Sequence, residues 1–215
     1  MNKVYEVIIS EYGYDEPVFT KDLKALLKDS MSDDALRQNM KRLADNGDLL
    51  KVENGIYYVP RKRSVLKNPR VNLDKVITRK YIKPKDEEII GYTCGINFAN
   101  QLGITSQTAS ITTIVSNATG RIRNEVSIGM KVIRLRKPKA EITSNNYKLL
   151  QVLDLLNDYE RVCEVPINNA INNIYKYLDD VNITQNEFND CLNKYSKKTV
   201  LRALDLGLNN EFTRR

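Results

Sequence analysis

The first sixty residues contain three short helical patterns followed by a hairpin pattern, and this order restricts the fold more than any other feature of the chain. Apolar residues recur at helical spacing at about residues 3–12, 20–27 and 32–46. Asn54-Gly55 then separates two β-prone runs, 49–53 and 56–59. We predict a β-hairpin there, because a type I′ turn needs positive φ at both central residues and Asn-Gly supplies them best.

Helix-start signals support two of the three helices. Thr20 precedes the second apolar run, and its hydroxyl is predicted to cap that helix by accepting from the amides of the first turn. Ser32 precedes the third, and the carboxylates of Asp33 and Asp34 suit the positive end of its dipole. The third helix should end at Asn46, with Gly47 closing it.

Three helices followed by a hairpin are the order of a winged helix-turn-helix, in which the helix before the hairpin enters the major groove of DNA. In that helix Leu36, Met40 and Leu43 share an apolar face opposite a polar one. Arginine and lysine contact phosphates or guanine, and glutamine pairs with adenine. The residues expected to bind DNA are therefore Arg37, Gln38, Lys41, Arg42, Lys51, Asn54, Arg61, Lys62 and Arg63.

Charge is distributed unevenly along the chain. The formal net charge is +7, but residues 1–60 carry eight basic and eleven acidic side chains, and residues 61–85 carry ten basic and one acidic. A segment so basic is suited to a polyanion through counterion release, although a solvated lysine-rich linker would look the same. The acidity of residues 1–60 opposes DNA binding unless Arg37 pairs with the acids of its own helix.

The rest of the chain predicts a mixed domain. Three β-branched runs, at 111–116, 125–128 and 131–136, indicate a small antiparallel sheet at about 108–136, and a short helix capped at Thr93 is expected before it. Helices should follow at about 144–207, one of them started by a capping box from Thr184 to Glu187. A cationic surface is expected from the helix after residue 70 and from the last strand, with the residues Arg70, Lys75, Arg79, Lys80, Arg134 and Arg136.

The expected fold class is therefore α+β, in three parts. Residues 1–60 form the winged helix-turn-helix, 61–85 a basic connecting segment with a helix, and 86–215 an α+β domain.

Several functions are disfavoured by what the sequence lacks. It has no histidine, which removes imidazole-activated nucleophiles and histidine-dependent zinc sites, and it has no phosphate-loop or dinucleotide fingerprint. We therefore expect no enzyme, no cofactor and no metal site. Three widely spaced cysteines suit reduced thiols, and neither a signal peptide nor an apolar run of membrane-spanning length is present, so we expect a cytoplasmic protein without membrane contact.

Some of these elements carry a family resemblance. The hairpin ending 54–60, the segment from Gly91-Tyr92-Thr93 to Gly103-Ile104-Thr105-Ser106-Gln107, and a strand ending Ser116-Asn117 resemble the AbiEi-like family of abortive-infection type IV antitoxins over about residues 3–136. The resemblance implies a bacterial antitoxin that represses its own promoter by binding inverted repeats. It also implies that the protein counteracts a nucleotidyltransferase-like toxin without a tight complex. The net negative charge of residues 1–60 departs from the pattern of the family and opposes the DNA binding that the resemblance implies.

Two alternatives stay open from the residues alone. The winged helix could be a scaffold in a module that binds an acidic protein or RNA, which would be recognised by co-purification at fixed stoichiometry. An enzyme would need carboxylates brought together from distant helices, which a sequence does not reveal. The operator, the toxin, the way toxicity is countered and the oligomeric state do not follow from the sequence.

Overall fold

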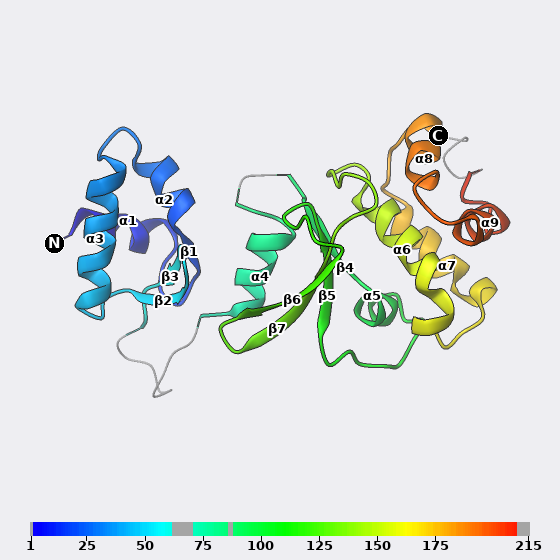
Figure 1. Ribbon diagram of the computed structural model, residues 1–215, viewed down its shortest axis with the longest axis horizontal. Helices are drawn as coiled ribbons and strands as arrows, with labels where there is room; N and C mark the ends of the chain where they lie inside the picture. Colours follow the sequence, from blue (N-terminus) through cyan, green and yellow to red (C-terminus); the bar gives the residue numbers. More distant parts are fainter. Residues whose placement is uncertain (1, 62–70, 86–87, 210–215) are drawn as a thin grey trace. The chain divides into compact units, whose positions relative to one another are not determined.

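The computed structural model describes residues 2–61, 71–85 and 88–209 (Figure 1). The fold is mixed α+β and divides into two compact units. The first unit runs to Arg79 and includes Ile128–Lys131, and the second comprises Lys80–Ser127 and the chain from Val132 onward. Three of the residues expected to bind a polyanion, Lys62, Arg63 and Arg70, lie outside the described residues.

The first unit begins with three helices and three short strands. In chain order these are α1 (Lys3–Glu11), β1 (Val18–Phe19), α2 (Thr20–Leu27), α3 (Asp33–Asp45), β2 (Leu50–Glu53) and β3 (Ile56–Tyr58). The strands form an antiparallel sheet in the order β1-β3-β2. The helices bury one apolar face each against a common core, which includes Val4, Ile8, Leu23, Leu36, Met40 and Leu43. The three predicted helices and the hairpin are confirmed.

Two details at the strands differ from prediction. Thr20 is the first residue of α2 rather than its cap, because its amide and hydroxyl both donate to the carbonyl of Gly55, at 2.8 and 3.1 Å. This contact continues the pairing of β1, which was not predicted, with β3. The hairpin turn is not type I′: Gly55 has φ +80°, but the described non-glycine residues with positive φ include only Asp15. A register shift between Lys51 and Glu53 accompanies the different turn.

The helix predicted after residue 70 is α4 (Leu73–Tyr81). The side chain of Asn72 accepts from the amides of Asp74 and Lys75, which satisfies two donors of the first turn. Val76, Ile77 and Tyr81 form its buried face. Pro84 follows shortly afterwards and prevents the helix from continuing.

Apart from Ile128 and Lys131, the second unit contains a four-stranded sheet, β4 (Gly91–Cys94), β5 (Thr112–Ser116), β6 (Arg123–Ile128) and β7 (Lys131–Arg136), in the order β4-β5-β7-β6. The sheet is mixed rather than antiparallel throughout, since β5 runs parallel to β7. The two-residue connection between β6 and β7 makes them an antiparallel hairpin, so β6 lies at the edge. Its alternation of exposed and half-buried residues suits that position.

The short helix predicted at Thr93 is also corrected. Gly91–Cys94 is strand β4, paired with β5 from Gly91 opposite Ser116 to Cys94 opposite Thr113, and the helix α5 is limited to Ile96–Gln101. Gly95, with φ +68°, stands between them as the helix N-cap. Gly91 has no room for a side chain, because a Cβ there would lie 2.1 Å from the carbonyl oxygen of Tyr81.

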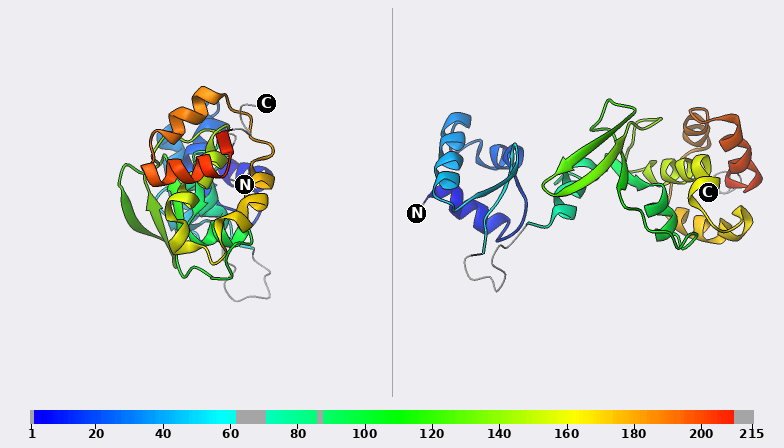
Figure 2. Two further views of the ribbon diagram at one scale, coloured as in Figure 1. Left: turned by 90° about the vertical axis from the view of Figure 1, so that its right-hand side faces the viewer. Right: turned by 60° about the horizontal axis from the view of Figure 1, so that its bottom comes forward.

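Four helices complete the second unit: α6 (Tyr147–Val162), α7 (Ile167–Leu178), α8 (Gln185–Leu192) and α9 (Lys197–Asp205). The capping box predicted at Thr184 and Glu187 is present. Figure 2 shows these helices gathered together at one side of the sheet, and α6, which packs on β4, is buried over most of its surface. None of the helices in the described ranges is long and apolar enough to span a bilayer.

Three polar side chains nevertheless lie in a row along buried α6. Gln151 donates to the carbonyl of Thr93 at 2.7 Å, and Asp154 accepts from the hydroxyls of Tyr92 and Tyr195 at 3.0 and 3.1 Å. One turn later, Asp158 accepts from Arg136 at 3.2 Å. Each buried polar group in the row therefore has a partner, as burial requires.

Candidate nucleic-acid interface

The outward face of α3 is polar and exposed, as predicted. Leu36, Met40 and Leu43 are buried, which turns Arg37, Gln38, Lys41 and Arg42 toward solvent. The Ser32 hydroxyl caps the helix by accepting from the amide of Ala35 at 3.3 Å. Among the described residues, the side chains of Gln38, Lys41 and Arg42 have no hydrogen-bond or ion-pair partner, so their polar groups are available to a ligand.

The two acids at the start of α3 are both neutralised within the unit. Asp33 accepts a hydrogen bond from Lys24 of α2 at 2.5 Å, and this bond lowers the pKa of the Asp33 carboxyl below its ordinary value. Asp34 pairs with Arg37, three residues later on the same helix, at 3.0 Å, which is the pairing that the sequence required for DNA binding. The repulsion that these carboxylates would exert on phosphates is therefore reduced.

The hairpin contributes two exposed polar residues and leads into a third. Lys51 on β2 and Asn54 at the turn are exposed. Arg61 is exposed as well, but it is bound to Asp15: its amide donates to that carboxylate at 3.2 Å and its Nε lies 3.7 Å from it. Asp15, which makes this contact with Arg61, has a backbone φ of 61°, in the left-handed region. Arg61 is thus positioned directly after the hairpin.

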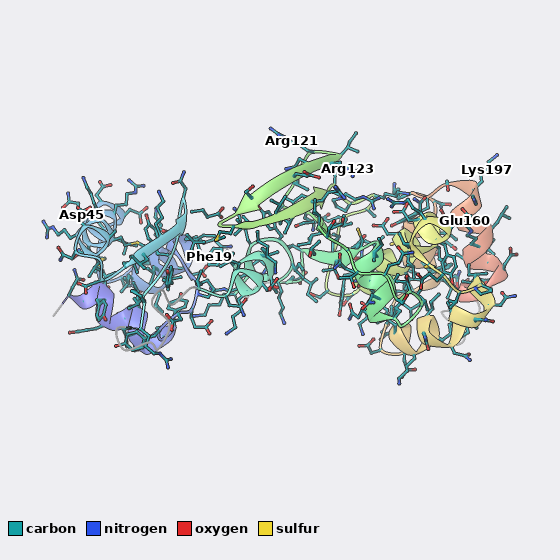
Figure 3. All side chains as sticks on the ribbon, turned by 90° about the horizontal axis from the view of Figure 1, so that it is seen from below. Phe19, Asp45, Arg121, Arg123, Glu160 and Lys197 are labelled. Atoms are coloured by element: carbon teal, nitrogen blue, oxygen red, sulfur yellow. The ribbon has the colours of Figure 1, made fainter. Side chains whose placement is uncertain are left out.

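The predicted cations of α4 make contacts within the molecule. Arg79 donates to Asp22 at 2.5 Å and to the carbonyl of Pro17 at 2.6 Å, its guanidinium lies over the rings of Tyr12 and Phe19, and only 19% of its side chain is exposed. Arg79 therefore ties the part of α4 up to Arg79 to the rest of the first unit, and little of its side chain is left exposed. Figure 3 labels Phe19, one of the two rings.

The other two cations of α4 are also engaged within the molecule. Lys75 forms an ion pair with Glu16. Lys80 lies over the ring of Tyr81, with its Nζ 5.2 Å from the ring centre. The partners of Arg79 and Lys75 come from sequence positions more than fifty residues away.

The predicted pair on β7 is brought together, but not as an open cationic face. Ile133 and Leu135 are buried on one side of the strand, and Arg134 and Arg136 share the other, as the alternation predicted. Arg134 pairs with Glu125 at 2.7 Å and Arg136 with Asp158 at 3.2 Å. Both arginines line a pocket of the second unit.

Two further cations of that pocket were not among the predicted site residues. Arg123, at the start of β6, and Arg161, near the end of α6, also line it. Arg123 lies within the sheet region predicted at about 108–136, two residues before the predicted run 125–128, and that position was a usable signal for the first. Nothing local marked Arg161, because its neighbours at helical spacing are those of an ordinary solvated helix end.

No cluster of three or more metal-ligating side chains occurs in the part of the chain that the structure describes. The three cysteines are unpaired, with Cys94 and Cys191 buried. Burial raises the pKa of the Cys94 thiol to about 12, so it is protonated at neutral pH and a poor nucleophile. The site with available, chemically suited side chains in the first unit is thus the exposed face of α3 with the hairpin beside it in sequence.

Comparison with known proteins yields no relative: no family model matches the chain, and no curated protein matches it significantly.

Proposed function

We propose that residues 1–60 are a winged helix-turn-helix that binds double-stranded DNA, with α3 in the major groove and the β2–β3 hairpin on the flanking backbone. The order of elements, three helices followed by a hairpin within one small core, supports this assignment. The single observation that carries the proposal is the exposed row Arg37, Gln38, Lys41 and Arg42 on a helix whose other face is buried.

The chemistry of these side chains fits the two tasks of a DNA-binding helix. Lys41 and Arg42 supply positive charge for phosphates, and Gln38 has the amide geometry that pairs with an adenine edge. Lys51 and Asn54 would hold the hairpin on the backbone, with Arg61 beyond it. Arg37 divides its charge between Asp34 and the duplex, so its contribution is smaller than that of Lys41.

At the level of the whole protein, we propose an antitoxin of the abortive-infection type IV kind. In this proposal the first unit binds inverted repeats in its own promoter and represses transcription, and the protein counteracts a nucleotidyltransferase-like toxin without a tight complex. It acts in the cytoplasm by binding and catalyses no reaction. This rests on the resemblance of residues 3–136 together with the exposed face of α3.

The test is fluorescence anisotropy of a labelled duplex that carries the sequence upstream of the gene, measured from low to high salt. Wild-type protein should bind with an affinity that falls steeply with salt. Lys41→Ala should weaken binding about tenfold and reduce the log-log salt slope by about 1. Lys176→Ala is the matched control, because Lys176 is an exposed lysine on α7 and its loss changes net charge equally.

Two results would overturn the DNA-binding proposal. One is the absence of any binding at low salt; the other is an equal loss in Lys41→Ala and Lys176→Ala, which would reflect net charge alone. The net negative charge of residues 1–60 favours one other function, a module that binds a basic or mixed protein surface. Nuclease-resistant co-purification with a single protein at fixed stoichiometry would support that function instead.

A further inference from the structure

The second unit contains a pocket of about 500 Å³, formed between β6, β7, the last turns of α6 and the loop that precedes β5. All of its lining residues belong to the second unit. Its volume is within the range of small-molecule sites, which is roughly 300–1,000 Å³. The pocket is separate in sequence and in unit from the proposed DNA-binding face.

Four arginines line this pocket, and they come from three elements: Arg123 from β6, Arg134 and Arg136 from β7, and Arg161 from α6. One acid, Asp158, is among the lining residues, and it accepts from both Arg136 and Arg161 at 3.2 and 2.8 Å. Outside the lining, Glu125 pairs with Arg134. After both acids are counted, these six side chains keep a net charge of +2, so the pocket attracts anions.

One donor in this cluster has no acceptor. The Nε of Arg134 is buried and has no hydrogen-bond partner among the described residues. Buried donors are almost always satisfied, and one that is not requires an explanation. That atom has almost no accessible surface, so an acceptor in the pocket would meet the outer end of the Arg134 guanidinium, one nitrogen of which stays with Glu125.

A second cation of the pocket is more accessible. Arg123 is exposed and makes no ion pair with another described residue. Figure 3 labels it at the end of the β6–β7 hairpin where β6 begins, together with its neighbour Arg121. Arg121 is also exposed but does not line the pocket. The chain therefore offers a matched control two residues from the test site.

Guanidinium groups present planar pairs of donors that match phosphate oxygens, which makes arginine clusters typical of phosphate sites. The same pocket has an apolar part, formed by Ile96, Ile111, Ile122 and Val162. We propose that this pocket binds a phosphate-bearing ligand of nucleotide size, whose phosphates contact Arg134 and Arg123 while its organic part lies on the isoleucines. A ligand without phosphate leaves the arginines unsatisfied and does not bind well.

The test is isothermal titration calorimetry of the full chain with three probes, ADP, inorganic pyrophosphate and adenosine, at low ionic strength. We expect ADP and pyrophosphate to bind and adenosine not to bind. Tighter binding of ADP would identify a nucleotide, and equal binding would identify the free phosphate chain. Arg123→Gln and Arg134→Gln should each weaken ADP binding about tenfold, the loss of one charge-assisted hydrogen bond, whereas Arg121→Gln should leave it within about twofold.

Arg123→Gln changes an exposed side chain and should leave the fold intact, whereas the Arg134 side chain is only 24% exposed, so far-UV circular dichroism of Arg134→Gln checks that this variant is folded. The proposal is overturned if neither phosphate probe binds, if adenosine binds as tightly as ADP, or if Arg121→Gln weakens binding as much as Arg123→Gln. It is also overturned if duplex DNA displaces ADP, because the arginines would then belong to the DNA interface. Failure of the promoter duplex to bind leaves this proposal unaffected.

Discussion

Replacing Arg79 with alanine is expected to destabilise the first unit by about 3 kcal/mol. The side chains of Arg79 and Asp22 are only 19% and 13% exposed, and their ion pair is 2.5 Å long. Removing one partner of a buried pair costs roughly 3–5 kcal/mol, because the other charge is left without compensation. Because some solvent reaches this pair, the expected cost lies at the lower end of that range. The substitution also removes the partner of the Pro17 carbonyl and of the rings of Tyr12 and Phe19, which adds to the cost.

Urea denaturation followed by far-UV circular dichroism measures this loss, since the chain has no tryptophan. Faster hydrogen exchange of the amides of α2 and α4 in the variant would assign the loss of stability to the first unit. Arg42→Ala, an exposed arginine of α3, is the control and should stay within about 0.5 kcal/mol of wild type. Adding Asp22→Ala to Arg79→Ala should recover part of the loss by removing the orphaned carboxylate. A cost below about 0.5 kcal/mol for Arg79→Ala, or no recovery in the double variant, would refute the reasoning.

Three other perturbations have defined outcomes. Ser32→Ala should cost about 1 kcal/mol in denaturant unfolding, whereas Ser32→Thr keeps the cap and should cost little; equal losses would contradict the capping role. In native protein at pH 8, Cys94 should react with a thiol reagent about a thousandfold more slowly than after unfolding, because burial raises its pKa to about 12; fast labelling, followed by mass spectrometry of peptides, would exclude this. Burial raises the pKa of Asp154 above its unfolded value of about 3.9, so the folded state holds this proton more tightly. Wild-type stability relative to Asp154→Asn should therefore fall as pH rises from about 4 through the folded pKa, and a difference that is constant with pH would contradict it.

Helices were predictable here to the extent that their apolar spacing was regular. Leu36, Met40 and Leu43 recur at intervals of three and four, and the matching face is buried in α3. Strand β1 was missed because two residues, Val18 and Phe19, carry no detectable alternation. They are held in place by β3, which lies far along the chain, so the reason for the strand is tertiary and not local.

The second sheet shows the same limit. The runs at β5, β6 and β7 were recognisable from their β-branched residues, but the order of the strands in the sheet was not. Because β6 takes the edge position, β7 lies between β5 and β6 and runs parallel to β5, and no local pattern specifies that order. Gly91–Cys94 contains glycine, tyrosine and threonine before a helical stretch, and its strand conformation is imposed by β5. Short segments of this kind follow their neighbours rather than their own propensity.

For the candidate site, exposure was predictable and pairing was not. The polar row of α3 followed directly from the helical wheel. The roles of Arg79 and Arg136 did not, because Asp22 and Asp158 reach them across 57 and 22 residues. Sequence charge therefore indicated where cations are dense, but the number left for a ligand depends on contacts that only the folded chain reveals.

The polar row along α6 also has a consequence for how the second unit assembles. An apolar helix can slide or rotate on an apolar surface at little cost, since one leucine contact replaces another. Gln151, Asp154 and Asp158 remove that freedom, because a shift by one turn would separate all three from the hydroxyls, carbonyl and guanidinium that now bind them. These three side chains thus fix the register of α6 against its neighbours. We expect variants in which all three are replaced by apolar residues to keep their helices but to populate several packings.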